Sequence, residues 1–224
     1  MTGPESAPPP DWRHIDTVLL DLDGTLLDLA FDNHFWLQCL PAELAAVRGW
    51  THEAALGELM QRFQAVHGTL EWYCIDYWNR TLGLDVGALH RREAARVSWL
   101  PGAQEFLAQV RARGKRLVLV TNAHPAALQV KEERAGIARR FDAVYSSHQF
   151  NAPKEDPAFW AGLRAVEPFD PRRALFVDDT PAVLRAAHEA GIHWIYGVRH
   201  PDRSAAPRDT CGLFTVIDGV IDLA

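Results

Sequence analysis

Five short apolar runs, each followed by turn residues and then by a helical pattern, constrain the fold of this chain more than any other feature. They are TVLLDL (17–22), RLVLVT (116–121), FDAVYS (141–146), RALFVD (173–178) and IHWIYG (192–197). Nearly continuous apolar runs of this length are typical of parallel strands covered by helices on both faces. Their alternation with helical patterns from about residue 100 to residue 197 predicts an α/β fold with a doubly wound, Rossmann-like parallel sheet.

Helix boundaries can be read from proline and glycine. Pro101 suits the first turn of a helix that stops at Gly114, and Pro181, after the capping residue Thr180, suits the first turn of another that stops at Gly191. The C-terminal TVIDGVIDLA predicts either an edge strand or a final helical turn.

One long interval interrupts the alternation of strands and helices. Residues 29–99 are far more than one connection needs, and they contain four helical patterns, at 32–49, 51–68, 70–83 and 85–99. We interpret 29–99 as a small helical domain inserted into a core formed by 13–28 and 100–224. The proline-rich residues 1–12 predict a disordered N-terminal tail.

Composition excludes several classes of protein. The chain has 224 residues, 48% hydrophobic and 23% charged, with a formal net charge of −6 and no long basic run. These values are ordinary for a globular protein and disfavour nucleic-acid binding, and no stretch has the length of a membrane span or the pattern of a secretory signal. We therefore expect a cytoplasmic protein with no nucleic-acid or membrane partner; the sequence does not indicate its oligomeric state.

Cysteine usage gives no sign of a structural metal or of disulfides. Cys39, Cys74 and Cys211 are far apart and form no CxxC pair. The spacing therefore supports neither a zinc site nor a disulfide framework.

The polar residues that could take part in catalysis or binding lie at the ends of the predicted strands or in the loops that follow them. They are Asp21, Asp23, Thr121, Asn122, Lys154, Asp178 and Asp179. Parallel strands place their carboxyl ends at one edge of the sheet, where open α/β folds bind their ligands. We expect these side chains to face a common space.

The negative charge expected at this edge of the sheet indicates which chemistry the site could perform. Two unit charges 4 Å apart at an effective dielectric constant of 20 interact with about 4 kcal/mol, so four clustered carboxylates need a cation. Oxygen ligands favour Mg²⁺, and we expect Asp21, Asp23, Asp178 and Asp179 to hold it. Such a site suits phosphoryl transfer, and we expect Lys154, the Thr121 hydroxyl, Asn122 and the N–H groups after Thr121 to bind the phosphoryl group.

Two carboxylates are suited to the covalent steps. Attack on phosphorus by Asp21 would give an aspartyl-phosphate, and Asp23 could protonate the leaving oxygen and then activate the water.

The same residues resemble the four motifs of the haloacid dehalogenase superfamily. DLDGT (21–25), the strand ending in Thr121, Lys154 before EDP, and VDDT (177–180) occur in the expected order. The resemblance implies that Asp21 is the nucleophile, that Asp23 is the acid and base, and that Thr121 and Lys154 bind the phosphoryl group. By position Asp179 resembles the direct Mg²⁺ ligand and Asp178 its support through water, and the insertion resembles a type 1 helical cap.

A narrower resemblance is to the bacterial GMP/IMP nucleotidase branch of that superfamily. It is carried by DGTLLDLAFDNHFW, LEWYCIDYW, TNAHP and PKED. The superfamily usually has Lys-Pro after the third strand, whereas this chain has Lys154-Glu155, as that branch does. The resemblance implies a Mg²⁺-dependent purine 5'-nucleotidase. The alternatives are a phosphatase or phosphomutase for another small phosphate ester, such as a sugar phosphate, and a non-catalytic interaction protein.

Each of these features also has a purely structural interpretation. An Asp-Gly pair can be only a turn, Lys154 a solvated charge, Thr121 a strand residue, and Asp178 or Asp179 a helix cap. The aromatic side chains of the insertion could stack on a purine, although such residues more often fill a core; they are Trp36, Trp72, Tyr73, Tyr77 and Trp78. His34 and His124 could contact substrate or simply end helices.

Overall fold

A computed structural model describes residues 10–208 and 214–224, and its centre is a six-stranded, fully parallel sheet with the order β3-β2-β1-β4-β5-β6. The strands are β1 (Thr17–Leu20), β2 (Arg116–Thr121), β3 (Ala143–Ser146), β4 (Ala174–Asp178), β5 (Trp194–Val198) and β6 (Thr215–Ile217). The strand order reverses direction at β1, so this sheet has the doubly wound arrangement expected from the apolar runs. The carboxyl end of β1 is therefore the point at which a ligand is expected to bind.

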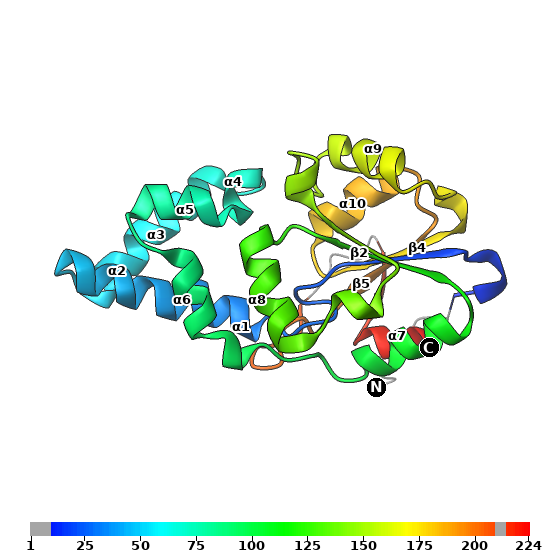
Figure 1. The fold of residues 1–224 in the computed structure, drawn as a ribbon, viewed down its shortest axis with the longest axis horizontal. Coiled ribbons are helices and arrows are strands. Elements are labelled where there is room, and N and C mark those ends of the chain that lie inside the picture. Colours follow the sequence, from blue (N-terminus) through cyan, green and yellow to red (C-terminus); the bar gives the residue numbers. More distant parts are fainter. Residues whose placement is uncertain (1–9, 209–213) are drawn as a thin grey trace, which may run out of the picture.

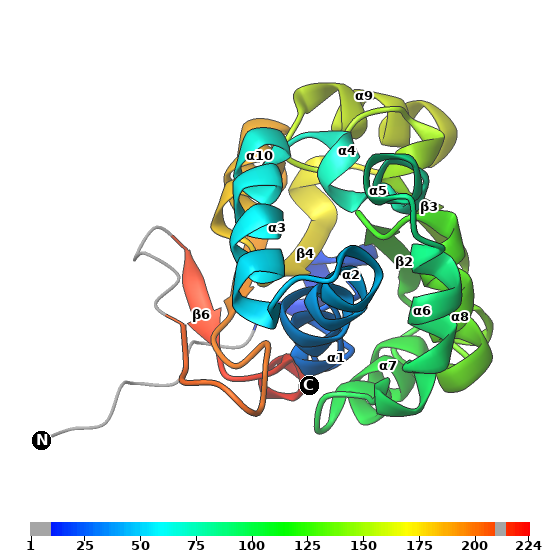
Figure 2. The ribbon, with the colours of Figure 1, turned by 90° about the vertical axis from the view of Figure 1, so that its left-hand side faces the viewer.

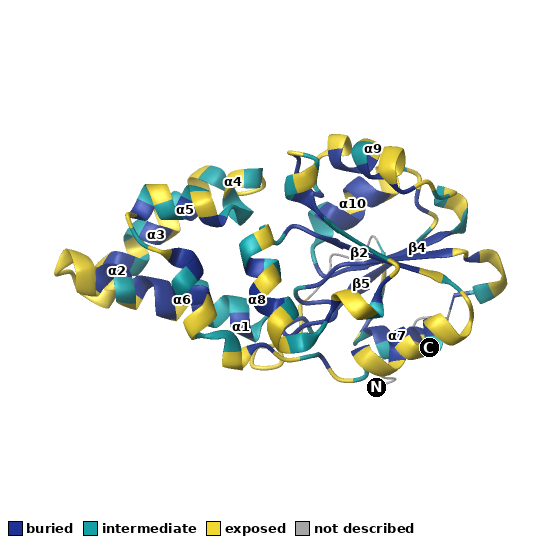
Figure 3. Ribbon diagram, in the orientation of Figure 1, coloured by how far each residue is buried: buried dark blue, intermediate teal, exposed yellow. Residues whose placement is uncertain are grey.

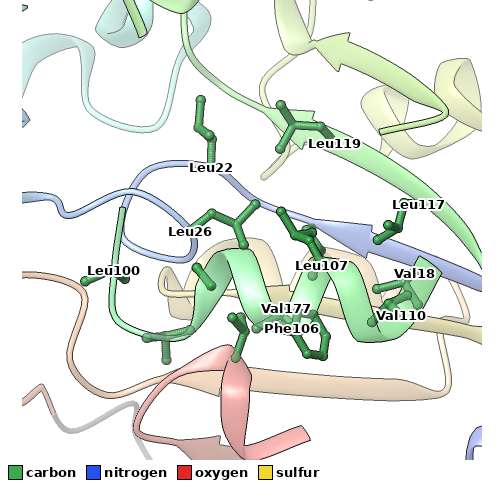
Figure 4. Close-up of a cluster of buried hydrophobic side chains, with 14 of the residues drawn as sticks. Val18, Leu22, Leu26, Leu100, Phe106, Leu107, Val110, Leu117, Leu119 and Val177 are labelled. Carbon is green, nitrogen blue, oxygen red and sulfur yellow. The ribbon is translucent and has the colours of Figure 1, made fainter. Parts of the chain in front are cut away.

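Helices cover both faces of this sheet (Figure 1). On one face lie α7 (Ala103–Ala112), α8 (Pro125–Ala135) and the C-terminal turn η7 (Val220–Leu223), and on the other α9 (Pro157–Val166) and α10 (Pro181–Glu189). Figure 4 shows Phe106, Leu107 and Val110 of α7 packed against side chains of β1 and β2. Alternate residues of β1, β2 and β4 pack into the two cores, which is why the inner positions of these strands are apolar and their polar residues lie at the strand ends.

Between β1 and α7 the chain forms a separate group of helices (Figures 1 and 2). They are α1 (Ala30–His34), η2 (Phe35–Cys39), α2 (Leu40–Arg48), α3 (His52–Val66), α4 (Leu70–Tyr73), α5 (Ile75–Leu82), α6 (Val86–Arg92) and η3 (Ala94–Arg96). Apart from Ala127 of α8, their buried hydrophobic cluster is drawn from this segment alone, and Figure 3 shows the exposed residues on its outer side. We call residues 29–99 the helical segment.

Three of the four helical patterns are interrupted. The fourth, at 85–99, forms only α6 and the short turn η3, and residues 97–99 are not helical. The first contains a π-helical turn, η2, which ends at Cys39, two residues before Pro41. Proline has no N–H to donate to the preceding turn, and the wider π turn accommodates that missing bond. The third is broken at Cys74, whose extended backbone (φ −86°, ψ 108°) separates α4 from α5.

The two ends of the described chain lie close together. Trp12, in the short helix η1 (Trp12–His14), donates its indole N–H to the carbonyl of Leu223 at 3.1 Å. Residues 1–9 of the expected N-terminal tail lie outside the described residues, as does Cys211. The C-terminal sequence forms both of its alternatives, an edge strand (β6) and a helical turn (η7). Among the helices of residues 10–208 and 214–224, none is long and apolar enough to cross a membrane.

Candidate active site

The sheet brings all seven predicted site residues to one pocket, at the carboxyl ends of β1, β2 and β4. The pocket has a volume of about 620 Å³, and its walls include Asp21, Asp23, Thr121, Asn122, Lys154, Asp178 and Asp179. Asp21 follows β1 directly, Thr121 is the last residue of β2, and Asp178 is the last residue of β4. The convergence expected from parallel strands is therefore present.

Lys154 holds two of the carboxylates. Its Nζ donates to Oδ1 of Asp21 at 2.5 Å, to Oδ2 of Asp178 at 2.7 Å and to the carbonyl of Val120 at 3.2 Å. The side chain is only 2% exposed. Burial by itself lowers the pKa of Lys154, but Asp178 and Asp21 outweigh burial, so the pKa is raised and the ammonium stays charged.

Asp21, Asp178 and Asp179 form a buried acidic cluster in which carboxylate oxygens lie within 4.8 Å of one another. Burial raises the pKa of Asp21 to about 7, of Asp178 to about 6 and of Asp179 to about 7. Neighbouring carboxylates add to this effect, while Lys154 and, for Asp179, Arg208 oppose it. Oδ2 of Asp21 is buried and has no hydrogen-bond partner among the described residues. A cluster whose donor atoms are all carboxylate oxygens fits a hard divalent cation.

Asp23 lies apart from that cluster, although the sequence analysis grouped it with the metal ligands. Its Oδ1 is 2.8 Å from Nζ of Lys131, and the same ammonium donates to both oxygens of Asp32 at 2.9 and 3.0 Å. Burial raises the pKa of Asp23, and Lys131 acts against that shift. Lys131 belongs to α8 and Asp32 to α1, so this ion-pair group joins the helical segment to the core.

Asn122 and Glu155 connect the phosphate-binding candidates to the helical segment. Asn122 accepts the N–H of Lys154 at Oδ1 (2.9 Å) and donates from Nδ2 to Glu155 (3.0 Å). Glu155 also accepts the hydroxyl of Tyr73, on α4, at 2.6 Å. Both polar atoms of the Asn122 side chain thus help to position this loop. The Thr121 hydroxyl accepts the N–H of Ala123 at 3.0 Å and lies at the pocket wall.

Arg208 and Gly24 complete the acidic end of the pocket. Arg208 donates to Oδ2 of Asp179 at 2.8 Å, so it neutralises part of the cluster from a loop after β5. Gly24 has φ +91°, and a Cβ atom there would lie 2.7 Å from Oδ2 of Asp179. Only glycine allows both this backbone conformation and this close approach.

The far wall of the pocket is aromatic and belongs to the helical segment. Its aromatic side chains are Trp36, Phe63, His67, Trp72, Tyr73 and His90, and Leu29, Asp32, Asn33, Gly68 and Ile75 of the same segment also line the pocket. Of the other aromatic candidates, Trp78 is fully buried in the core of the segment and Tyr77 packs against it. His124 lines the pocket, whereas His34 is 3.6 Å from Glu93 and is absent from the walls.

Sequence reasoning did not assign roles to Lys131, Asp32 or Arg208. The only hint was the scarcity of lysine, since the chain has just Lys115, Lys131 and Lys154. Five buried or half-buried carboxylates, those of Asp21, Asp23, Asp32, Asp178 and Asp179, are in contact with three cations. This excess of negative charge favours the binding of a further cation.

A carboxylate cluster at the strand-order reversal of a Rossmann-like sheet, with a buried lysine beside it, is suited to holding a cation together with an anionic ligand. Residues 15–191 match the family model described as haloacid dehalogenase-like hydrolase, and the chain belongs to this family. It is a phosphatase of the family, and the resemblance seen in its motifs is confirmed.

Individual proteins and solved structures of this family are also similar to the chain. The chain is 42% identical, over 88% of its length and 89% of the relative, to the GMP/IMP nucleotidase YrfG of Escherichia coli. It is 26% identical to a phosphoglycolate phosphatase of Pseudomonas putida, over 82% of this chain and 70% of that one. The crystal structure of a haloacid dehalogenase-family phosphatase from Thermococcus onnurineus is similar in fold, with a TM-score of 0.76 at 21% identity over 93% of this chain and 96% of that one.

Proposed function

We propose that this phosphatase is a Mg²⁺-dependent purine 5'-nucleotidase that acts on GMP and IMP through an aspartyl-phosphate. The observation that carries the proposal is a pocket with two unlike ends. One end holds the acidic cluster and Lys154, which suit a phosphoryl group and a cation, and the other is aromatic. The similarity to a GMP/IMP nucleotidase over most of both chains supports the same substrate class.

The residues that would hold Mg²⁺ are Asp21 and Asp179, with Asp178 beside them. When bound, Mg²⁺ would mask the negative charge of the carboxylates and of the phosphoryl group. Lys154 is already placed to share that task at Asp21. The metal role expected for Asp23 is not part of this proposal, because its carboxylate is paired with Lys131.

The covalent chemistry divides into two steps. Lys154 fixes Oδ1 of Asp21, which leaves Oδ2 free to attack phosphorus. The bond from phosphorus to the ester oxygen breaks, and Asp23 gives that oxygen a proton. Asp23 then takes a proton from water as the water attacks the aspartyl-phosphate, which releases phosphate and restores Asp21.

We propose that the helical segment, residues 29–99, is a cap that selects the substrate. A volume of about 620 Å³ is within the range of sites for molecules of nucleotide size and exceeds what a two-carbon phosphate ester would fill. Trp36 and Trp72 at the far wall offer faces on which a purine could stack.

Phosphate release from a panel of esters tests this proposal. We expect kcat/KM for GMP and IMP to exceed that for pyrimidine nucleotides, phosphoglycolate, phosphoserine and glucose 6-phosphate by at least about 10-fold, a discrimination that contacts to one base can supply. We expect EDTA to abolish the activity and added Mg²⁺ to restore it. Highest efficiency on phosphoglycolate or a sugar phosphate would replace the nucleotidase assignment with the small-ester alternative.

The role of Asp23 can be tested through its partner Lys131. We expect Lys131→Met to reduce kcat for GMP at least about 10-fold more than kcat for p-nitrophenyl phosphate, because nitrophenolate leaves without a proton donor whereas an alkoxide does not. A purely structural loss would lower both rates by the same factor. Steady-state kinetics on the two substrates provides the comparison, and equal losses would exclude the positioning role of Lys131.

A further inference from the structure

A second group of metal-binding side chains lies at the junction of the helical segment and the core. Sγ of Cys74 and ring nitrogens of His124 and His148 lie within 4.8 Å of one another. Cys74 stands between α4 and α5, His124 precedes α8, and His148 belongs to the short helix η5 (Ser147–Gln149). The group is separate from the acidic cluster and differs from it in chemistry, since it offers sulfur and nitrogen in place of oxygen.

His124 turns one ring nitrogen toward a carboxylate and keeps the lone pair of the other, Nδ1, as an acceptor. Nδ1 accepts the N–H of Ala126 at 3.2 Å, which places the proton on Nε2, and a metal ion at Nδ1 would take the place of this hydrogen bond. Nε2 is 3.6 Å from Oδ2 of Asp76. Histidine ligands commonly have a carboxylate behind the nitrogen that faces away from the metal. Burial lowers the pKa of His124, which favours the neutral ring.

His148 provides an independent observation. Both of its ring nitrogens are buried, and neither has a hydrogen-bond partner within residues 10–208 and 214–224. Buried polar atoms without a partner are rare in proteins, and a bound ion would satisfy one of these nitrogens. Burial, followed by the proximity of His124, lowers the pKa of His148 to about 4, so a nitrogen lone pair is available at neutral pH.

Cys74 supplies the third ligand from the other side of the junction. Its Sγ accepts the N–H of Tyr77 at 3.4 Å, in the first turn of α5. The thiol is half-buried and free of disulfide bonding. A thiolate and two neutral imidazoles are donors that prefer Zn²⁺ and similar borderline-soft ions to Mg²⁺.

We propose that Cys74, His124 and His148 form a second metal site, selective for Zn²⁺ or a similar divalent transition-metal ion. Tetrahedral zinc bonds of about 2.3 Å to sulfur and 2.0–2.1 Å to nitrogen place the ligand atoms about 3.4–3.6 Å apart, so side-chain shifts of about 1 Å complete the site. An ion there ties the α4–α5 junction, next to Tyr73 of the pocket wall, to the core. The CxxC criterion could not find it, since its ligands come from three distant segments.

Cobalt absorption tests the site without measuring turnover. We expect one equivalent of Co²⁺, added to reduced protein in excess Mg²⁺, to produce a sulfur-to-cobalt charge-transfer band in the near ultraviolet, and Zn²⁺ to remove it by displacement. The acidic cluster cannot give this band because it contains no sulfur. A failure to bind Co²⁺ would therefore overturn the second metal site and leave the nucleotidase proposal intact. A lack of nucleotidase activity would likewise leave the second metal site intact.

Matched variants assign the ligands. We expect the band to persist in Cys39→Ser and Cys211→Ser and to vanish in Cys74→Ser. We expect His148→Ala to weaken Co²⁺ binding at least about 10-fold. Circular dichroism of the metal-free variants checks that each is folded, and His148→Ala remains decisive if Cys74→Ser is not. A wild-type protein without the band, or a band that survives unchanged in the folded variant Cys74→Ser or His148→Ala, would overturn the proposal.

Discussion

Replacing Asp21 by asparagine is expected to lower kcat by at least about 10⁴-fold while leaving the protein folded. An amide has nearly the shape of the carboxylate but is a far poorer nucleophile, so the covalent step should fail. Stability should be unchanged or higher, because the substitution removes one negative charge from a buried cluster in which burial raises the pKa of Asp21 to about 7. Phosphate-release kinetics and thermal unfolding measure the two effects.

A matched substitution separates loss of chemistry from loss of charge. Asp218→Asn removes an exposed carboxylate that pairs with Arg199 and His200 at the surface, and we expect wild-type kcat and melting temperature from it. Residual turnover of Asp21→Asn within about 10-fold of wild type would exclude Asp21 as the nucleophile.

Removing the ammonium of Lys154 is expected to damage both stability and activity. Lys154→Met leaves Asp21 and Asp178 buried without their cation, and breaking a buried ion pair from one side typically costs about 3–5 kcal/mol. The free energy of unfolding in urea should fall by that amount, and Mg²⁺ should recover part of it because the ion binds the same carboxylates. We expect kcat/KM to fall at least about 10²-fold, as it does when one preorganised charge contact is lost.

Lys115 offers the control for this prediction. It is one of the three lysines of the chain and lies outside the pocket, so Lys115→Met should change the free energy of unfolding by no more than about 0.5 kcal/mol and leave kcat/KM unchanged. Near wild-type turnover in a folded Lys154→Met protein would mean that the ammonium has no role at the phosphoryl group.

The sheet and the convergence of the site could be predicted because both follow from local pattern. Apolar runs identified five of the six strands, and β2 (Arg116–Thr121) has the bounds expected for it. Once strands are parallel, residues at their carboxyl ends must share one edge, which is why Asp21, Thr121 and Asp178 could be placed together without a structure. The family assignment rests on the same strand-end motifs and is confirmed.

The contacts that sequence reasoning missed all depend on how separate elements pack. Lys131 of α8 contacts both Asp23, in the loop after β1, and Asp32 of α1, and no spacing along the chain encodes that approach. Arg208 reaches Asp179 from an irregular loop for the same reason. The sequence shows Glu155 where the superfamily usually has a proline after the lysine. The hydrogen bond from the Tyr73 hydroxyl to Glu155, however, depends on the position of α4.

Local pattern was also less informative inside the helical segment. Apolar periodicity identified helices there, yet it could not show the π turn before Pro41 or the break at Cys74, which depend on single residues. The division into core and cap, and the catalytic roles of the individual side chains, stay predictions that the experiments above address.

Trapping of the phosphoenzyme tests the central claim most directly. Wild-type protein is mixed with GMP that is radiolabelled in its 5'-phosphate and is quenched in acid within one turnover. The peptide that contains Asp21 should then carry a label that hydroxylamine removes. The label should accumulate in Asp23→Asn, where attack by water is slowed, and be absent in Asp21→Asn. Complete single-turnover hydrolysis with no labelled peptide in either wild type or Asp23→Asn, or label attached to another residue, would contradict the aspartyl-phosphate mechanism.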